Sequence, residues 1–187
     1  MSQQPEQAEQ LIRELGSLTD QARTIGRSRI TGVPLLGWGI AFGVGYAALD
    51  LLDGAARLVV VLLAWAVGML GSWYPVRHAI RTGSEGRIRW GWVVVLGASP
   101  FLVAAAQPSS WIYTALFLGG LWGLAMCLYA VATEDVPFVV ASIAVVVLAA
   151  LAAGQDLAPP LALFGVTTAL PLLVLGVRRT LVGSRHV

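Results

Sequence analysis

Few side chains in this sequence of 187 residues could take part in catalysis or metal binding. The single cysteine, Cys127, falls in an apolar run, which excludes an internal disulfide and a cysteine metal cluster. The two histidines, His78 and His186, are far apart in the sequence. No Asp, Glu, Arg or His lies in the middle of an apolar run, where an ionisable group usually marks a functional site. We therefore expect no metal, no cofactor and no enzymatic activity.

Four arginines lie in one short polar segment between the second and third apolar runs, at Arg77, Arg81, Arg87 and Arg89. If the second helix extends past the membrane, Arg77 and Arg81 share one of its faces. Two interpretations are open. The charges fix the orientation of the chain in the bilayer, or they bind a lipid phosphate or an anionic partner surface.

The first 30 residues are polar apart from one repeating apolar pattern. Residues of this pattern recur at spacings of 4, 3, 4 and 3, which predicts an amphipathic helix. One interpretation has the helix lying on the inner leaflet, and another has it docking a cytoplasmic partner or a second copy. Gly16 and Gly26 favour a third, a mostly unstructured arm. The apolar residues are Leu11, Leu15, Leu18, Ala22 and Ile25.

The composition indicates an integral membrane protein that contacts the lipid bilayer directly. Hydrophobic residues make up 57% of the chain and charged residues only 12%, with a mean hydropathy of +0.78. An average soluble domain is about 25% charged. Six apolar runs of 16 to 22 residues follow the arm, and about 20 apolar residues cross a bilayer as a helix. They lie at 33–49, 58–76, 91–106, 111–132, 136–153 and 158–177.

The sequence thus predicts an all-α, polytopic fold of six transmembrane helices in three hairpins. We expect a cytoplasmic arm at 1–30, a transmembrane domain at 31–180 and a tail at 181–187. The third run is the shortest and becomes long enough if Trp90 and Gln107 lie at the interfaces. Ser99 before Pro100, and Thr167 and Thr168 before Pro171, are interpreted first as helix kinks and second as pocket-lining residues.

Arginine distribution predicts the orientation. Eleven of the twelve arginines precede the first run, separate the second from the third, or follow the sixth. The positive-inside rule then places both termini in the cytoplasm, with the protein in the plasma membrane and only Arg57 outside. The basic balance has this topological explanation, so no nucleic-acid partner is expected.

Three further local patterns carry predictions. Thr133 before Glu134 and Pro137 predicts a helix start, although Glu134 and Asp135 could instead pair with the arginine cluster. Asp50, Asp53 and Arg57 predict an exposed, salt-linked turn.

Gly39 and Gly43 form a GxxxG pair, which allows close helix packing either within the chain or in a homodimer.

The first 50 residues carry a family resemblance. The polar helix "RELGSLTDQARTIGRSR" runs into the apolar start "GVPLLGWGIAFGVGYAAL". This layout resembles small actinobacterial multi-pass integral membrane proteins of unknown function, which tend to be encoded beside winged-helix regulators. In that family an aromatic pair usually precedes the first proline of the span, whereas Gly32 and Val33 precede Pro34 here. The resemblance implies a compact six-span body and assigns no functional residue.

Three functions remain open at this point. The first is a non-enzymatic accessory or regulatory subunit, or a small permease component, that docks a cytoplasmic partner. The alternative is a stand-alone transporter or binder of an apolar or lipid-like small molecule. A membrane enzyme ranks last because no acid/base pair or metal set is present. Candidate polar contacts for the second function are Tyr46, Gln107, Tyr113, Thr114, Thr167 and Thr168.

Overall fold

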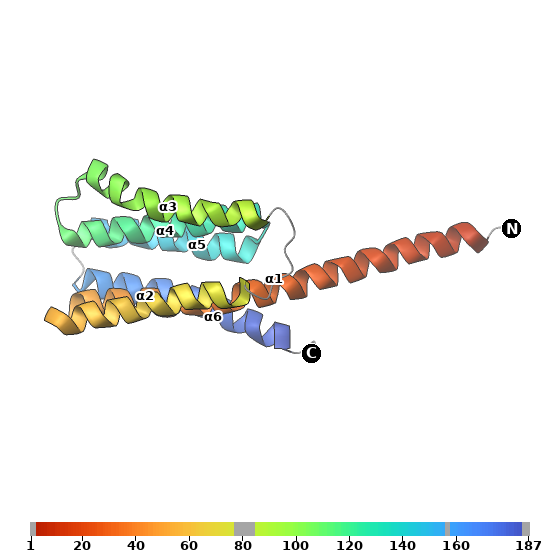
Figure 1. Ribbon diagram of the computed structural model, residues 1–187, viewed down its shortest axis with the longest axis horizontal. Helices are drawn as coiled ribbons and strands as arrows, with labels where there is room; N and C mark the ends of the chain where they lie inside the picture. Colours follow the sequence, from red (N-terminus) through yellow and green to blue (C-terminus); the bar gives the residue numbers. More distant parts are fainter. Residues whose placement is uncertain (1–2, 77–84, 156–157, 185–187) are drawn as a thin grey trace.

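The computed structural model describes residues 3–76, 85–155 and 158–184, with side chains at 10–16, 31–73, 90–155 and 158–181. Throughout these residues the regular structure is α-helical, as the composition predicts. Six helices follow one another along the chain (Figure 1). They are α1 (Gln3–Leu51), α2 (Gly54–Val76), α3 (Glu85–Ala106), α4 (Trp111–Ala132), α5 (Val136–Gly154) and α6 (Pro160–Ser184).

Helix α1 joins the polar arm and the first apolar run into one element of 49 residues. At a rise of 1.5 Å per residue it is about 73 Å long, more than twice the thickness of a hydrocarbon core. It continues through Gly16, Gly26 and Pro34 without a break. In Figure 1 its first part leaves the bundle along the bundle's long axis. An arm lying flat on the inner leaflet would need a bend before the span.

Five helices are long and apolar enough to cross a membrane, with windows at 31–51, 54–73, 111–132, 136–154 and 160–181. The apolar part of α3, Trp90–Ala106, is shorter. It nevertheless runs alongside α4 over most of its length (Figure 1). The chain is therefore a helical membrane protein with at least five candidate spans.

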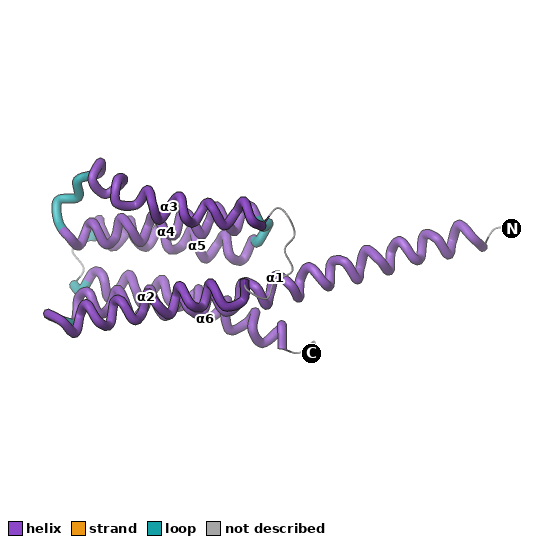
Figure 2. Tube along the Cα trace, in the orientation of Figure 1, coloured by secondary structure: helices purple, strands orange, loops and turns teal. Residues whose placement is uncertain are grey.

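The helices form two layers, which Figure 2 shows as separate rows of tubes. Helices α1, α2 and α6 form one layer, with α1 packed between the other two. Helices α3, α4 and α5 form the second layer, with α4 in the middle. The layers meet where α6 contacts α4 and α5. Both described termini lie at one end of the bundle, the terminal end; the tight turns at 52–53 and 107–110 mark the opposite, loop end.

Glycines bring α1 and α6 together along their whole shared length, which we call the α1–α6 seam. A Cβ atom on Gly39 would lie 2.7 Å from Leu173 Cγ, and one on Gly43 would lie 3.0 Å from Ala169 Cβ. From the α6 side, a Cβ atom on Gly165 would lie 2.7 Å from the Phe42 carbonyl oxygen. Small residues permit this approach, and van der Waals contact then holds the helices together in lipid.

Aromatic side chains fill the space between the layers. Trp38 of α1 stacks on Trp92 of α3, with ring centroids 6.4 Å apart and planes inclined by 9°. Trp65 of α2 meets Trp122 of α4 edge to face at 4.7 Å. Phe42 packs against Trp122 at 6.4 Å. Large rings therefore hold apart two layers that are each packed closely inside.

Candidate functional site

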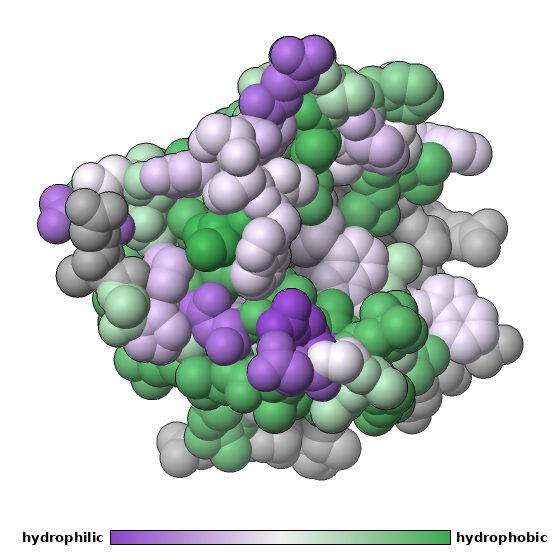
Figure 3. All heavy atoms as spheres, turned by 90° about the vertical axis from the view of Figure 1, so that its left-hand side faces the viewer, coloured by the Kyte–Doolittle hydropathy of each residue, from purple (hydrophilic) through white to green (hydrophobic). Residues whose placement is uncertain are grey.

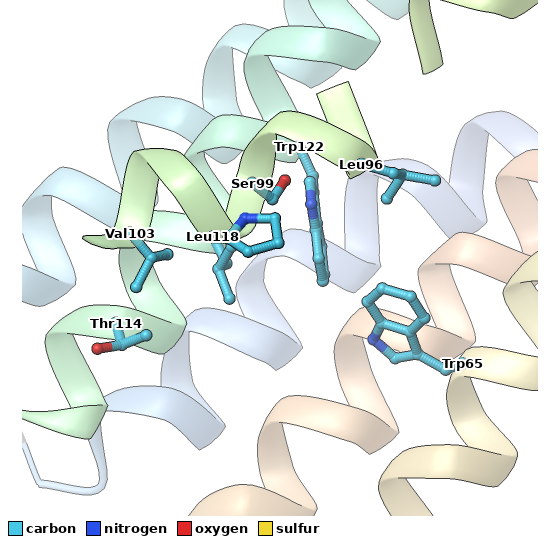
Figure 4. A pocket seen from close by; sticks show the side chains of 8 residues that line it. Trp65, Leu96, Ser99, Val103, Thr114, Leu118 and Trp122 are labelled. Atoms are coloured by element: carbon cyan, nitrogen blue, oxygen red, sulfur yellow. The ribbon is translucent and has the colours of Figure 1, made fainter. Parts of the chain in front are cut away.

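A cleft of about 480 Å³ lies between α2, α3 and α4. This volume is within the range of about 300–1,000 Å³ typical of small-molecule sites. In Figure 4, Trp65 of α2 faces the side chains that α3 and α4 contribute. The cleft extends from the two tryptophans near the middle of the spans to Thr114 near the loop end. Its lining residues are Trp65, Leu96, Ser99, Pro100, Val103, Thr114, Leu118 and Trp122.

The cleft exists because α2 and α3 do not pack together. Along the described residues the backbone of α2 lies close to α1 alone and that of α3 close to α4 alone, and only side chains such as Trp65 and Trp92 reach across to the other layer. The backbones of α2 and α3 nowhere come into contact within those residues. Because both helices lie at the outside of their layers, the space between them opens to the outside of the bundle.

One side-chain donor and one backbone acceptor at the cleft lack their usual hydrogen-bond partners. The Trp122 Nε1 atom is buried and has no hydrogen-bond partner among the described residues. Pro100 has no N–H group, so the Leu96 carbonyl lacks the helical donor that position 100 would otherwise supply. The Ser99 hydroxyl does not replace that donor, since it donates to the Val95 carbonyl at 2.7 Å. The cleft is thus bordered by one donor and one acceptor that lack their usual partners, and its other polar lining residues are Ser99 and Thr114.

Only one of the six candidate polar contacts, Thr114, lines the cleft. The Tyr46 hydroxyl is buried elsewhere and donates to the Ala115 carbonyl at 2.9 Å, which ties α1 to α4. Thr168 is buried in α6, and Thr167 donates to the Leu163 carbonyl at 2.7 Å. Tyr113 is 43% exposed, and Gln107 lies in the exposed α3–α4 turn.

The two tryptophans of the cleft could not be singled out from the sequence, because nothing in the pattern distinguishes them from tryptophans at the membrane interface. The pocket-lining alternative for Ser99 and Pro100 was the one available signal, and both residues do line the cleft.

A buried ionic cluster ties three segments together at the terminal end. Arg179 of α6 donates to Asp135 Oδ1 and to the Thr31 hydroxyl of α1, each at 2.6 Å. Asp135 is 3% exposed and also accepts from the backbone N–H of Phe138, in the first turn of α5. The Arg179 guanidinium lies 5.9 Å from the centre of the Phe138 ring. We call Thr31, Asp135 and Arg179 the terminal-end cluster.

A helix begins in this segment as predicted, with Pro137 in its first turn. Its N-cap is Asp135 rather than Thr133, which is the C-cap of α4. Glu134 adopts a φ of 55° in the turn between them, which separates the two helices. Asp135 pairs with Arg179 of α6. Its predicted pairing with the arginine segment at 77–89 stays a prediction, because the side chains of that segment are outside the described residues. Arg77 and Arg81 lie outside the described residues, and the side chains of Arg87 and Arg89 are outside them too.

The loop end is more exposed. Arg57 pairs with Asp53 at 2.7 Å and donates from Nε to the Leu52 carbonyl at 2.6 Å. Asp53 and Arg57 thus form the predicted exposed, salt-linked turn, in which Asp50 takes no part. The Asp50 Oδ2 atom accepts from the backbone N–H of Ala162 at 2.8 Å, which caps the start of α6. Figure 3, which looks onto this end, shows hydrophilic side chains in small groups among hydrophobic ones.

The arm exposes apolar side chains where they are described. Leu11 is 59% exposed, Ile12 69% and Leu15 62%. The remaining residues of the predicted stripe, Leu18, Ala22 and Ile25, lie within α1, but their side chains are outside the described set. Gly39 and Gly43, further along the same helix, face α6 of the same chain. Their small surfaces are therefore occupied by an intramolecular contact and are not open to a second copy.

These features define a polytopic helical membrane protein with a long helical arm and a cleft between α2, α3 and α4. No group of three His, Cys, Asp or Glu residues in the described part of the chain is placed to hold a metal ion. Comparisons with protein-family models, curated proteins and solved structures found no match to this chain.

Proposed function

We propose that this protein is a non-enzymatic accessory or regulatory subunit, or a small permease component, that docks a cytoplasmic protein through the arm of α1. It spans the plasma membrane six times, with α3 as the remaining span and both termini in the cytoplasm. The position of both described termini at one end of the bundle supports an even number of crossings (Figure 1). The arginine distribution supports the orientation.

The observation that carries this proposal is the length and direction of α1. Residues 3–30 of the helix extend it by about 42 Å beyond the first span. A single polar helix with exposed leucines is marginally stable in water unless its apolar face is covered. Leu11 and Leu15 lie one turn apart, on one face, where a partner helix or groove would cover both.

The distribution of charge along the arm favours a protein, rather than the membrane, as the surface that binds its apolar face. Residues 1–20 hold four acidic residues and one arginine, a formal charge of −3, whereas residues 21–30 hold three arginines and no acid. The anionic inner leaflet attracts the arginine-rich part next to the span and repels the acidic part beyond it. Two parallel copies of the acidic part would also repel each other. The occupant we propose is a cytoplasmic protein with an apolar groove bordered by basic residues.

The test measures how much cytoplasmic protein is recovered together with the full-length chain when it is purified in mild detergent. It compares the wild type with two variants. The double variant Leu11→Gln/Leu15→Gln removes the apolar face while keeping helix propensity, and Arg13→Gln changes a neighbouring position between the two leucines. We expect a stoichiometric cytoplasmic protein with the wild type and with Arg13→Gln, and at least a tenfold loss with the double variant. The proposal fails if recovery is equal for all three, or if the wild type is recovered alone or as a dimer by mass.

The cleft favours a second candidate, a binder or transporter of an apolar small molecule. Its volume, its tryptophan walls and its opening to the outside of the bundle support this function. Cleft and arm lie in different parts of the molecule, so the two functions are separable. Variants that fill the cleft would impair this function and leave partner recovery through the arm unchanged.

A further inference from the structure

The two unpaired polar groups of the cleft indicate what kind of molecule it binds. Trp122 Nε1 is a donor without a partner, and the Leu96 carbonyl is an acceptor without its helical donor. A buried polar group without a partner is destabilising, and the low dielectric of a membrane strengthens any bond that satisfies it. A hydroxyl group is the smallest group that can accept from one and donate to the other.

Both groups belong to residues that line the cleft. The Leu96 carbonyl points along α3 toward position 100, since helical carbonyls point toward the residue four positions ahead. Leu96 and Pro100 both line the cleft, and Trp122 lines it from α4. In Figure 4 the six-membered part of the Trp122 ring reaches toward Trp65, and the indole nitrogen lies on the part nearer Ser99. The nitrogen is thus on the part of the ring that lies toward α3.

The rest of the cleft suits a hydrocarbon chain. Leu118, Val103 and the Trp65 ring provide apolar walls between the middle of the spans and the loop end. A molecule dissolved in the bilayer can enter sideways, because α2 and α3 do not contact each other along the described residues. We propose that the cleft binds a long-chain molecule bearing one hydroxyl group, which accepts from Trp122 Nε1 and donates to the Leu96 carbonyl. This rests on the second candidate function above and specifies its ligand.

The experiment measures tryptophan quenching by brominated chains in bilayer nanodiscs that contain the full-length protein. Three probes share one chain and differ at one end: 9,10-dibromooctadecan-1-ol, its methyl ether and 9,10-dibromooctadecane. Quenching of lipid-facing tryptophans rises linearly with the mole fraction of the probe. Quenching of a tryptophan at a binding site saturates as the site fills. We expect saturation by the alcohol at roughly three- to tenfold lower mole fraction than by the ether, which can only accept, and a weaker response to the alkane.

Variants locate the site. Val103→Phe fills the cleft and removes the saturable component, whereas Leu102→Phe, on the neighbouring exposed position, retains it. Trp122→Phe keeps an aromatic ring without the donor, so half-saturation by the alcohol and the ether rises roughly three- to tenfold while the alkane is unaffected. In this variant Trp65 still reports on the cleft.

The possible failures are distinguishable. Equal saturation by alcohol, ether and alkane overturns the hydroxyl assignment and leaves the cleft as a site for apolar chains. Linear quenching by all three overturns both the assignment and the second candidate function. Saturation that persists in Val103→Phe places the bound chain elsewhere and overturns the proposal.

Discussion

The two ends of the bundle carry ion pairs of nearly equal length in very different surroundings. At the terminal end Arg179 and Asp135 lie 2.6 Å apart, with side chains 11% and 3% exposed. At the loop end Arg57 and Asp53 lie 2.7 Å apart, with side chains 35% and 99% exposed. Water and ions screen the exposed pair, whereas removing one member of the buried pair leaves a charge without a partner. Burial, and not distance, therefore decides which pair matters to the fold.

The same contrast extends to what each pair connects. The terminal-end pair joins α6 to the start of α5, and through Thr31 to α1, so it links both layers. The loop-end pair joins residues four apart around one turn. The link between layers at the loop end comes instead from Tyr46, whose hydroxyl reaches α4. Each end is thus closed by a buried polar contact, and the exposed pair is additional.

The largest effect is expected from Asp135→Ala. It leaves the buried Arg179 without its carboxylate and removes the N-cap of α5, which should destabilise the fold by about 3–5 kcal/mol. Thermal unfolding in mild detergent, followed by loss of the monodisperse species, measures it. The double variant Asp135→Ala/Arg179→Met should be less destabilised than the single one, because no charge remains buried. Glu134→Gln, at the exposed neighbouring residue, is the control; a similar loss there would contradict the contrast between the two ends.

Local sequence pattern was sufficient for the helices and insufficient for the contacts between them. Apolar runs of bilayer length predict the helices from α2 to α6, since composition alone decides whether such a segment is buried in lipid. The pairing of Asp135 with Arg179 spans 44 residues, and the bond from Ala162 to Asp50 spans 112. Such contacts depend on which helices become neighbours. Nothing in the local pattern of either residue specifies that.

The cleft and the continuity of α1 were missed for related reasons. Gly26 and Pro34 are ordinary reasons to end a helix, yet α1 passes through both because packing against α2 and α6 holds the segment beyond them. The cleft depends on α2 and α3 being consecutive in sequence and separated in space. Short connections usually make neighbours of consecutive helices, so no space between these two helices could be expected from the sequence.

The second largest effect is expected within the seam that connects the two ends. Gly165→Ala would place a Cβ atom 2.7 Å from the Phe42 carbonyl oxygen and equally close to Tyr46 Cβ. Because one contact is with backbone, α1 and α6 must move apart, which should destabilise the fold by about 1–3 kcal/mol in the same assay. Gly97→Ala is the matched control, since no atom lies within 4 Å of its added methyl group. Equal stability of the two variants would show that the seam tolerates separation.

A smaller effect is expected from the capping residue at the loop end. Asp50→Ala removes the acceptor for the Ala162 N–H and should destabilise the fold by about 0.5–2 kcal/mol. Asp50→Asn should restore most of this stability because its amide oxygen accepts the same hydrogen bond. Stability in Asp50→Asn as low as in Asp50→Ala would mean that the negative charge near the start of α6, rather than the hydrogen bond, is what stabilises it.

The smallest effect is expected from Asp53→Ala, which tests the exposed ion pair against the buried one. It removes an ion pair of the same length as the one at the terminal end, but its carboxylate is 99% exposed. Arg57 keeps its bond to the Leu52 carbonyl and its position 5.6 Å from the centre of the Trp111 ring. We therefore expect unfolding within error of the wild type, at both low and high salt. A loss approaching that of Asp135→Ala would mean that pairing distance outweighs burial in this bundle, and the ranking of its two ends would have to be reversed.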